Sequence, residues 1–329
     1  MANFKDIIGQ EQIKKHLQDG IRKHKLSHAY IINGEVGSGR RLLASALTKT
    51  LLCEDRTEQG DACGKCKSCL QVDSNNHPDV RFITHEKLSI SVDDIREQLV
   101  NDIGIKPYSS AHKIYIIPDS NKMTEQAQNA LLKTIEEPPE YAIILLVTES
   151  AENLLPTIQS RCVTLNTQPL SKESITQYLI KNLQMEPERA ELAAGFCQGN
   201  VGKAIHFASS DDFQEMKRET LQLLKEVDNL EIAELMVMVR GLSVRKGQIN
   251  EYLDLMVLWY RDVLMFKVTK DANILLYREE YQAISRQASN KSYENIENII
   301  KAIDKAKVRL NANVNFDTAI ELLLLTMKD

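Results

Sequence analysis

Hydrophobic residues in the first half of the chain gather in short runs that alternate with stretches of helical spacing. The last two runs are almost continuous isoleucine, leucine and valine, which is typical of strands buried on both faces of a parallel sheet. Strands that alternate with helices predict an α/β fold, a parallel sheet with flanking helices. We expect strands at residues 29–33, 80–84, 114–118 and 142–148, and helices at 41–52 and 124–137.

The strand pattern fades after about residue 165, and amphipathic helices follow one another with breaks at Pro169 and Pro187. Ser171 is a plausible N-cap for a helix through residue 180. The pattern predicts three parts: an α/β part at 1–165, a small helical part at 166–210 and an all-α part at 211–329. Helices are expected in the last part at 213–227, 232–239, 249–268, 293–310 and 316–327.

Composition limits the classes of function. With 329 residues and 43% hydrophobic residues, the chain can bury a substantial core. A net charge of -5 and a pI near 5.9 argue against a surface that binds nucleic acid throughout, so DNA contacts should be local. The N-terminus lacks the apolar segment of a signal peptide, and no uncharged apolar run is long enough to span a membrane. We therefore expect a soluble, cytoplasmic protein.

A glycine-rich loop follows the first predicted strand. Gly34, Gly37 and Gly39 have the spacing of a phosphate-binding loop, but Arg40 and Arg41 occupy the positions of its lysine and its hydroxyl. Arginine cannot ligate magnesium, and its planar fork replaces a compact ammonium poorly. The sequence therefore predicts a degenerate loop without nucleotide binding, although its backbone N-H groups could still hold a phosphate or sulfate.

A second defect lies after the strand at 114–118. P-loop ATPases end this strand in acidic residues; Asp119 is present here, but Ser120 replaces the expected glutamate. The general base that polarises the attacking water is therefore absent. Two independent defects favour a chain that does not hydrolyse nucleotide by itself.

Four cysteines form the other chemical motif. Cys53 precedes Cys63, Cys66 and Cys69, which carry two nested C-x-x-C spacings. In a reducing compartment this spacing indicates a closed tetrahedral site, and we interpret it as one structural zinc ion. An iron–sulfur cluster and a redox thiol pair are the alternatives, although the fourth ferredoxin-type cysteine, followed by proline, is missing. The isolated cysteines Cys162 and Cys197 are expected to be packing residues.

Several motifs in fixed order carry a resemblance. They are residues 4–10 (FKDIIGQ), 28–30 (HAY), the four cysteines, 129–139 (NALLKTIEEPP) and 160–162 (SRC). Together they resemble the clamp-loader subunits of bacterial DNA polymerase III, a family of the AAA+ class. The motifs cover the first half of the chain, and the helical remainder matches only in length and character. The resemblance implies an AAA+ domain with a zinc module at 1–165, a lid at 166–210 and an oligomerising collar at 211–329.

The same resemblance implies a role in replication. The gamma/tau branch of the family hydrolyses ATP, whereas the delta-prime branch has a degenerate loop, and this sequence sides with delta-prime. Implied partners are the gamma/tau ATPase and delta subunits in a hetero-oligomeric ring, with primer-template DNA and the sliding clamp. Arg161 of the SRC motif would reach ATP bound by the neighbouring subunit, in the manner of an arginine finger. Arg96 would lie on a helix near DNA, although an exposed ion pair with Asp93 or Glu97 explains it equally well.

Two other interpretations remain open. A weakly active ATPase of gamma/tau type would tolerate Arg40 and would bind nucleotide as a purified chain. A stand-alone zinc-dependent nucleic-acid-binding protein would bind DNA tightly by itself. The acidic net charge and the 5% aromatic content disfavour the second alternative.

Overall fold

A computed structural model describes residues 3–209, 211–312 and 314–328. The chain divides into two compact units, residues 1–205 and 206–329. The domain boundary expected near Ser210 falls on a residue outside the described ranges. Among the described helices, none combines the length and the apolar character that a membrane span requires.

A five-stranded sheet with the order β2-β3-β4-β1-β5 forms the centre of the first unit, and every pairing in it is parallel. The fold class predicted from the sequence is thus confirmed. Non-consecutive neighbours place β1 between β4 and β5, so the loop after β1 lies at a point where the strand order reverses. Ligands of open α/β sheets bind at such points. The strands are β1 (Ala29–Asn33), β2 (Val80–Phe82), β3 (Lys113–Ile117), β4 (Ala142–Thr148) and β5 (Val163–Asn166).

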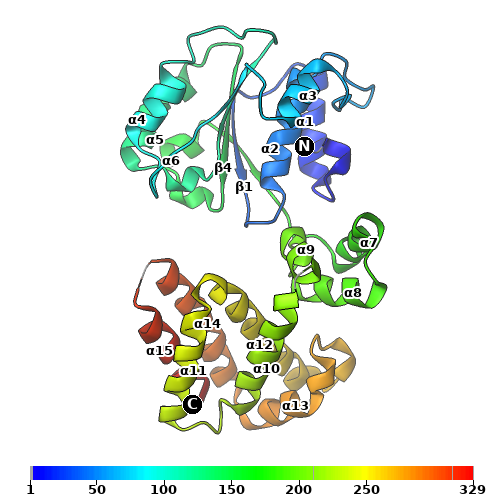
Figure 1. The fold of residues 1–329 in the computed structure, drawn as a ribbon, viewed down its shortest axis with the longest axis vertical. Helices are drawn as coiled ribbons and strands as arrows, with labels where there is room; N and C mark the ends of the chain where they lie inside the picture. The colour runs from blue at the N-terminus through cyan, green and yellow to red at the C-terminus, as the bar shows by residue number, and fades with distance from the viewer. Residues whose placement is uncertain (1–2, 210, 313, 329) are drawn as a thin grey trace. The chain divides into compact units, whose positions relative to one another are not determined.

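Helices cover both faces of this sheet, as Figure 1 shows. The helices on one face are α1 (Glu11–Arg22), α2 (Arg40–Leu52) and α3 (Lys67–Asp73). The helices on the other face are α4 (Val92–Ile95), which continues as a π-helical turn at Arg96–Val100, α5 (Glu125–Glu136) and α6 (Pro156–Gln159). Short 3₁₀ turns lie at Phe4–Asp6, Ser120–Lys122 and Ala151–Asn153.

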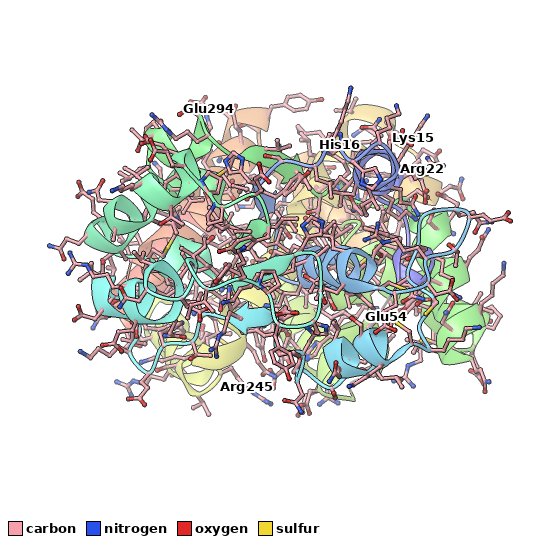
Figure 2. The ribbon with its side chains drawn as sticks, turned by 90° about the horizontal axis from the view of Figure 1, so that it is seen from above. Lys15, His16, Arg22, Glu54, Arg245 and Glu294 are labelled. Atoms are coloured by element: carbon pink, nitrogen blue, oxygen red, sulfur yellow. The ribbon has the colours of Figure 1, made fainter. Side chains whose placement is uncertain are left out.

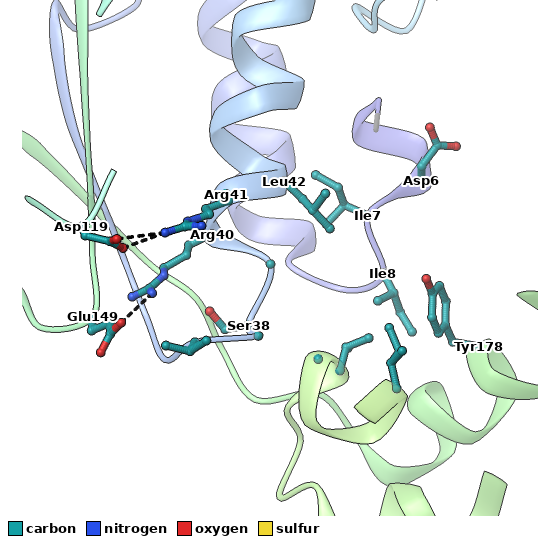
Figure 3. Close-up of a pocket in the computed structure, with 16 residues that line it drawn as sticks. Asp6, Ile7, Ile8, Ser38, Arg40, Arg41, Leu42, Asp119, Glu149 and Tyr178 are labelled. Carbon is teal, nitrogen blue, oxygen red and sulfur yellow. Dashed lines mark hydrogen bonds and ion pairs between the residues drawn. The ribbon is translucent and has the colours of Figure 1, made fainter. Parts of the chain in front are cut away.

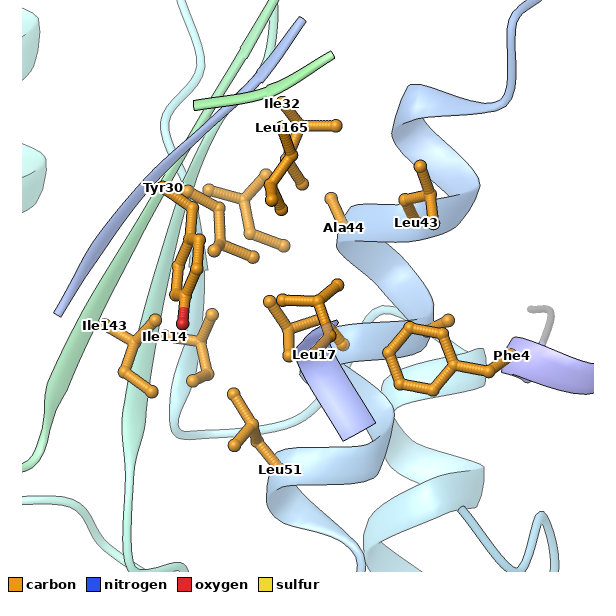
Figure 4. Close-up of a cluster of buried hydrophobic side chains, with 14 of the residues drawn as sticks. Phe4, Leu17, Tyr30, Ile32, Leu43, Ala44, Leu51, Ile114, Ile143 and Leu165 are labelled. Atoms are coloured by element: carbon orange, nitrogen blue, oxygen red, sulfur yellow. The ribbon is translucent and has the colours of Figure 1, made fainter. Parts of the chain in front are cut away.

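Alternating residues of each strand supply two separate cores. In β1, Tyr30 and Ile32 pack with Leu17 of α1 and Leu43 of α2, as Figure 4 shows, whereas Ile31 belongs to the core on the other face. This alternation follows from the two-residue period of a strand. It explains why the run at 29–32 is apolar: both faces of the strand are buried there.

For the sheet and its flanking helices, the sequence located four of the five strands and helices α2 and α5. Strands β1 and β4 have the predicted bounds, β3 begins one residue earlier, and β2 ends at Phe82 because it is an edge strand. Helix α5 begins after Thr124, whose side chain accepts a hydrogen bond from the backbone N-H of Ala127. No prediction was made for α1 or for β5. Strand β5 has only four residues, two of them exposed, so its apolar signal is weak.

A small helical segment follows β5 with α7 (Lys172–Leu183), α8 (Pro187–Phe196) and α9 (Val201–Ser209), and the division between the two units falls within α9, after Ile205. Ser171 caps α7 as predicted, because its hydroxyl accepts a hydrogen bond from the N-H of Ser174. Gly199 has a φ of 83°, in the left-handed region that favours glycine, and a Cβ there would lie 2.7 Å from Pro169. This turn sets the direction in which α9 begins.

The second unit is entirely helical. Its centre is α12, in which Trp259 is fully buried and donates from Nε1 to Gln287 Oε1 at 2.8 Å. Gln287 in turn donates to the carbonyl oxygen of Leu224, so one amide joins three helices. All five helices predicted here start within two residues of the expected positions, and α11 runs on to Val244. The helices are α10 (Asp211–Glu226), α11 (Ile232–Val244), α12 (Ile249–Thr269), α13 (Tyr281–Asn290), α14 (Tyr293–Asn311) and α15 (Phe316–Lys328), with 3₁₀ turns at Lys246–Gln248, Ala272–Ile274 and Arg278–Glu280.

Candidate functional site

A cleft of about 430 Å³ opens at the carboxyl end of β1 in the first unit. The glycine loop forms one wall, Ile7 and Ile8 form another, and Tyr178 and Val201 belong to the helical segment, as Figure 3 shows. This is where an α/β fold of this order would place a nucleotide. The charged residues that line the cleft are Asp6, Arg40, Arg41, Asp119 and Glu149.

Arg40 is turned inward against its own loop. Its side chain is only 5% exposed; Nη1 donates to the carbonyl oxygen of Gly34 at 2.7 Å, and Nη2 lies 3.0 Å from Oε1 of Glu149. A lysine at this position would extend an ammonium toward bound phosphates. Here the guanidinium is used to join the start of the loop to the residue that follows β4.

Arg41 binds the acidic residue at the end of β3. Its Nη2 donates to both carboxylate oxygens of Asp119, at 2.9 and 3.0 Å. Burial alone would raise the pKa of Asp119, but the hydrogen bond and positive charge of Arg41 outweigh burial and lower it. A working site would use this carboxylate and a hydroxyl at position 41 around magnesium. In this chain the guanidinium of Arg41 pairs with the carboxylate of Asp119 instead.

The helical segment is fastened directly to the glycine loop. Asn200 donates from Nδ2 to the carbonyl oxygen of Val36 at 2.7 Å, and the N-H of Gly202 donates to the carbonyl oxygen of Gly37 at 3.0 Å. On the other side of the loop, the hydroxyls of Thr167 and Ser38 are 3.0 Å apart. These contacts link the loop to α9 through protein groups alone.

The remaining polar residues at this edge of the sheet are structural. Ser120 is fully buried, and its hydroxyl donates to the carbonyl oxygen of Val147 at 3.1 Å. Thr148 is also buried and donates to the carbonyl oxygen of Ser150. Neither hydroxyl is directed at the cleft by these bonds, which agrees with a packing role.

The four cysteines of the predicted metal module lie together. Their Sγ atoms are all within 4.8 Å of one another, and the Cys53–Cys66 and Cys63–Cys69 pairs are each separated by 4.0 Å. A tetrahedral zinc ion with bonds of about 2.3 Å requires sulfurs about 3.8 Å apart. A disulfide requires about 2.05 Å, and all four cysteines are free. The donor set therefore fits a metal ion with four sulfur ligands.

Backbone N-H groups point at these sulfurs. The amides of Lys65 and Cys66 donate to Sγ of Cys63, and the amide of Cys69 donates to Sγ of Cys66. The hydrogen bonds from Lys65 and Cys66 lower the pKa of Cys63 to about 7, whereas burial raises the pKa of Cys69. The turn thus favours a thiolate at Cys63, the form that binds metal.

A chain of buried polar groups links this module to the sheet. Ser68, between two of the cysteines, donates to the carbonyl oxygen of Leu52 and lies 3.0 Å from Nε2 of His77. The other ring nitrogen of His77 accepts the N-H of Asp79. The carboxylate of Asp79 accepts the backbone N-H groups of Tyr108, Ser109 and Ser110. The cysteine module and the 108–110 loop are therefore parts of one network.

Arg161 lies after α6, and its side chain is 40% exposed. Its Nε is 2.8 Å from Oε1 of Glu136, and Nη1 donates to the carbonyl oxygen of Thr157 at 3.0 Å. The side chain is thus held on the surface by α5 and α6. Arg161 is far from the glycine loop, because it precedes β5 and the loop follows the other end of the adjacent strand β1.

The predicted residues thus form three separate groups: Gly34, Gly37, Gly39, Arg40 and Arg41 at the cleft, the four cysteines, and Arg161. Sequence reasoning missed Glu149 and Glu136, the acidic partners of Arg40 and Arg161. Glu149 directly follows β4, the neighbour of β1, and this position was a usable signal for a residue close to the glycine loop. No local sequence feature marks Glu136 as the partner of Arg161. Arg96 is exposed, and neither of the ion pairs considered for it is found within the described residues.

Comparison with known proteins agrees with this architecture. Residues 9–171 match the sequence family described as "DNA polymerase III, delta subunit". A curated relative, DNA polymerase III subunit delta' of Bacillus subtilis (strain 168), is 32% identical over 324 residues, which covers 97% of this chain and 96% of the relative. DNA polymerase III subunit tau of the same organism is 27% identical, and the chain spans 96% of its own length but 60% of that protein. A DNA polymerase III gamma subunit-related protein of Thermotoga maritima superposes over 95% of this chain and 98% of that one, with 21% identity and a TM-score of 0.49.

The chain therefore belongs to the clamp-loader subunits of bacterial DNA polymerase III. Within that class, the delta' subunit of Bacillus subtilis is a relative that this chain matches over nearly the full length of both proteins.

Proposed function

We propose that this chain is a clamp-loader subunit of delta-prime type, which does not hydrolyse ATP and serves as a stator in its complex. The observation that carries the proposal is the pairing of Arg40 with Glu149 and of Arg41 with Asp119. Magnesium nucleotide needs a lysine, a hydroxyl and a free carboxylate in these places. Here arginines replace the lysine and the hydroxyl, and Arg41 pairs with the carboxylate of Asp119.

The proposal has a definite electrostatic basis. Arg41 is 65% exposed, so its pair with Asp119 contributes only about 0–1 kcal/mol, and a competing ligand could break it. Arg40 is 5% exposed, and separating it from Glu149 would leave a buried cation without its carboxylate. Loss of nucleotide binding thus depends more on Arg40, which fixes the loop, than on Arg41.

We further propose that Arg161 acts on ATP bound by a neighbouring subunit. The pairing of Val163 with Tyr30 places Arg161 at the level of residue 28, six residues before Gly34 along β1. At about 3.3 Å per residue this separation is about 20 Å, beyond the reach of one side chain. This distance argues against action on the chain's own loop and supports a phosphate contact in trans.

In this proposal Glu136 holds Arg161 until assembly. The pair joins two half-exposed side chains, so exchange of Glu136 for a polyphosphate costs little. A guanidinium at a γ-phosphate stabilises the charge that develops during transfer. Arg161 would therefore raise the turnover of the adjacent subunit without any nucleotide bound to this chain.

The remaining assignments also belong to the proposal. The four cysteines would hold one structural zinc ion that orders residues 53–69, since the donor set is all sulfur and closed. Residues 1–165 would form the AAA+ domain, 166–210 the lid and 211–329 the collar that joins gamma/tau and delta subunits. Primer-template DNA and the sliding clamp would be met as part of that complex.

Reconstitution with the partner ATPase tests the central claim. Arg161→Ala should assemble normally but reduce DNA-stimulated ATP hydrolysis by about 10²-fold or more. Arg22→Ala is the matched control, because Arg22 is also an exposed arginine with a local acidic partner, Asp19. Normal turnover of an assembled Arg161→Ala complex would refute the finger role. Saturable magnesium–ATP binding by the purified wild-type chain would refute the degenerate loop and favour a weak gamma/tau-type ATPase.

A further inference from the structure

A second polar cavity, of about 190 Å³, lies in the first unit at the opposite end of the sheet from the glycine loop. Its walls include His28, which directly precedes β1, and His112, which directly precedes β3. The other ionisable residues that line it are His24, Arg56 and Glu140. Three histidines and an arginine therefore surround one space that the proposed clamp-loader function does not use.

Two histidines that line this cavity each carry one ring nitrogen with unmet hydrogen-bonding capacity. Nε2 of His28 and Nδ1 of His112 are shielded from solvent and have no partner among the described residues. A buried polar atom without a partner costs free energy, so each ring would gain from turning this nitrogen toward a polar occupant of the cavity. The cavity has room for one: at about 30 Å³ per water it would hold about six water molecules.

Arg56 gives the cavity a fixed positive charge. Its guanidinium is held by two backbone carbonyls, with Nε donating to Thr50 at 2.8 Å and Nη2 donating to Leu51 at 2.7 Å. Neither contact is with an acid, so the charge of Arg56 is not neutralised by these bonds. Glu140 is the one carboxylate that lines the cavity, and it is exposed.

The charges around His112 favour an anion over a cation. Burial lowers the pKa of His112, and the positive charges of Arg56 and His24 lower it further. A bound anion would relieve this repulsion, whereas a metal ion would add to it. Within the described residues, the only group of three or more histidine, cysteine or acidic side chains with converging ligand atoms is the cysteine module, so these histidines do not form a metal site.

We propose that this cavity binds a phosphate-sized oxyanion, either free phosphate or the phosphate group of a nucleic acid, through His28, His112 and Arg56. The ring nitrogens would donate to its oxygens, and the guanidinium would balance its charge. Because the histidines donate best when protonated, affinity should increase as the pH falls. His24, His28 and His112 face the oxyanion as titratable cations, and Glu140 opposes it.

Histidine-selective NMR of the full chain, with the cysteine site saturated with zinc, tests this proposal. Inorganic phosphate should shift the His28 and His112 resonances saturably, and the affinity should be severalfold higher at about pH 6 than at about pH 7.5. His112→Gln should abolish saturation. His16→Gln is the control, since His16 is an exposed histidine on α1 that does not line the cavity, and it is labelled in Figure 2. Glu140→Gln should increase the affinity, a gain that damage to the fold would not produce.

Further titrations distinguish free phosphate from the phosphate of a nucleic acid and define the results that would overturn the proposal. Competition by single-stranded DNA that carries a 5′-phosphate, but not by the same DNA without it, would identify nucleic acid as the source; no competition would indicate free phosphate. Shifts that do not saturate, or that persist in His112→Gln, would mean an adventitious ion only and overturn the proposal. Saturable shifts with a further equivalent of zinc, but none with phosphate, would also overturn it.

Discussion

Gly37 and Gly202 approach each other so closely that Gly202 cannot carry a side chain in this arrangement. A Cβ on Gly202 would lie 2.5 Å from Cα of Gly37, and the backbone of Gly202 already donates a hydrogen bond to Gly37. The contact is made by backbone atoms on both sides, so it fastens the helical segment directly to the glycine loop.

Substitution of Gly202 should loosen this attachment. In Gly202→Ala, the clash is with backbone, which cannot move aside cheaply, and we expect a loss of about 1–3 kcal/mol in unfolding free energy. Gly241→Ala is the matched control, because Gly241 also lies inside a helix but a Cβ there meets nothing within 4 Å. That change should stabilise the chain by up to about 1 kcal/mol. Denaturant unfolding and amide exchange of the loop measure both variants; equal effects would contradict the contact's role.

Restoring a lysine and a hydroxyl to the glycine loop should restore binding of magnesium–ATP but not its hydrolysis. The double variant Arg40→Lys, Arg41→Thr is expected to bind magnesium–ATP at least about tenfold more tightly than wild type, because a compact ammonium and a hydroxyl return and Asp119 is released. Hydrolysis should remain absent, because Ser120 is buried and cannot act as a base. Calorimetric titration and a steady-state assay distinguish the two steps. Wild-type affinity in the double variant would show that another barrier excludes nucleotide.

Removing the metal should disturb a loop that contains no cysteine. The hydrogen bonds through Ser68, His77 and Asp79 connect the module to residues 108–110. We therefore expect chelation, or Cys66→Ala, to accelerate amide hydrogen exchange at these residues by about tenfold or more, equivalent to about 1.4 kcal/mol. Cys162→Ala is the control, since Cys162 packs against the other face of the sheet. Unchanged exchange at Ser109 and Ser110 after chelation would refute this coupling.

The same loop should respond to acid through Asp79. Burial alone would raise the pKa of Asp79, but its hydrogen bonds from Tyr108, Ser109 and Ser110 outweigh burial and lower it. A lowered pKa in the folded state means that the carboxylate stabilises the fold above the ordinary aspartate pKa of about 3.9, and that this stabilisation disappears as the pH falls through the lower folded value. Asp79→Asn should therefore be less stable at neutral pH and lose less stability below about pH 4. Unfolding curves between about pH 2 and pH 7 give the comparison, and parallel curves for the two proteins would count against it.

The layout of the first unit could be predicted where the sequence carries a local signal. Continuous apolar runs located β1 and β4, and the nested cysteine spacing located a cluster whose sulfurs do converge. Strand β5 gave no such signal, because an edge strand of four residues buries few side chains. The acidic partners of Arg40 and Arg41 also could not be predicted from the sequence. Glu149 is 109 residues from Arg40 and Asp119 is 78 residues from Arg41, and only the strand order brings these pairs together.

Arg161 and the glycine loop lie at opposite ends of the strands, so the two ends of the sheet would face different neighbouring subunits. If Arg161 serves the next subunit, copies with this fold can join only head to tail, as in a heterologous interface. A member whose own loop is sealed gains nothing from an incoming arginine. We therefore expect this subunit to lie at one end of the row of ATPase subunits. It would supply an arginine to the ATP site of one neighbour and would accept an arginine from none.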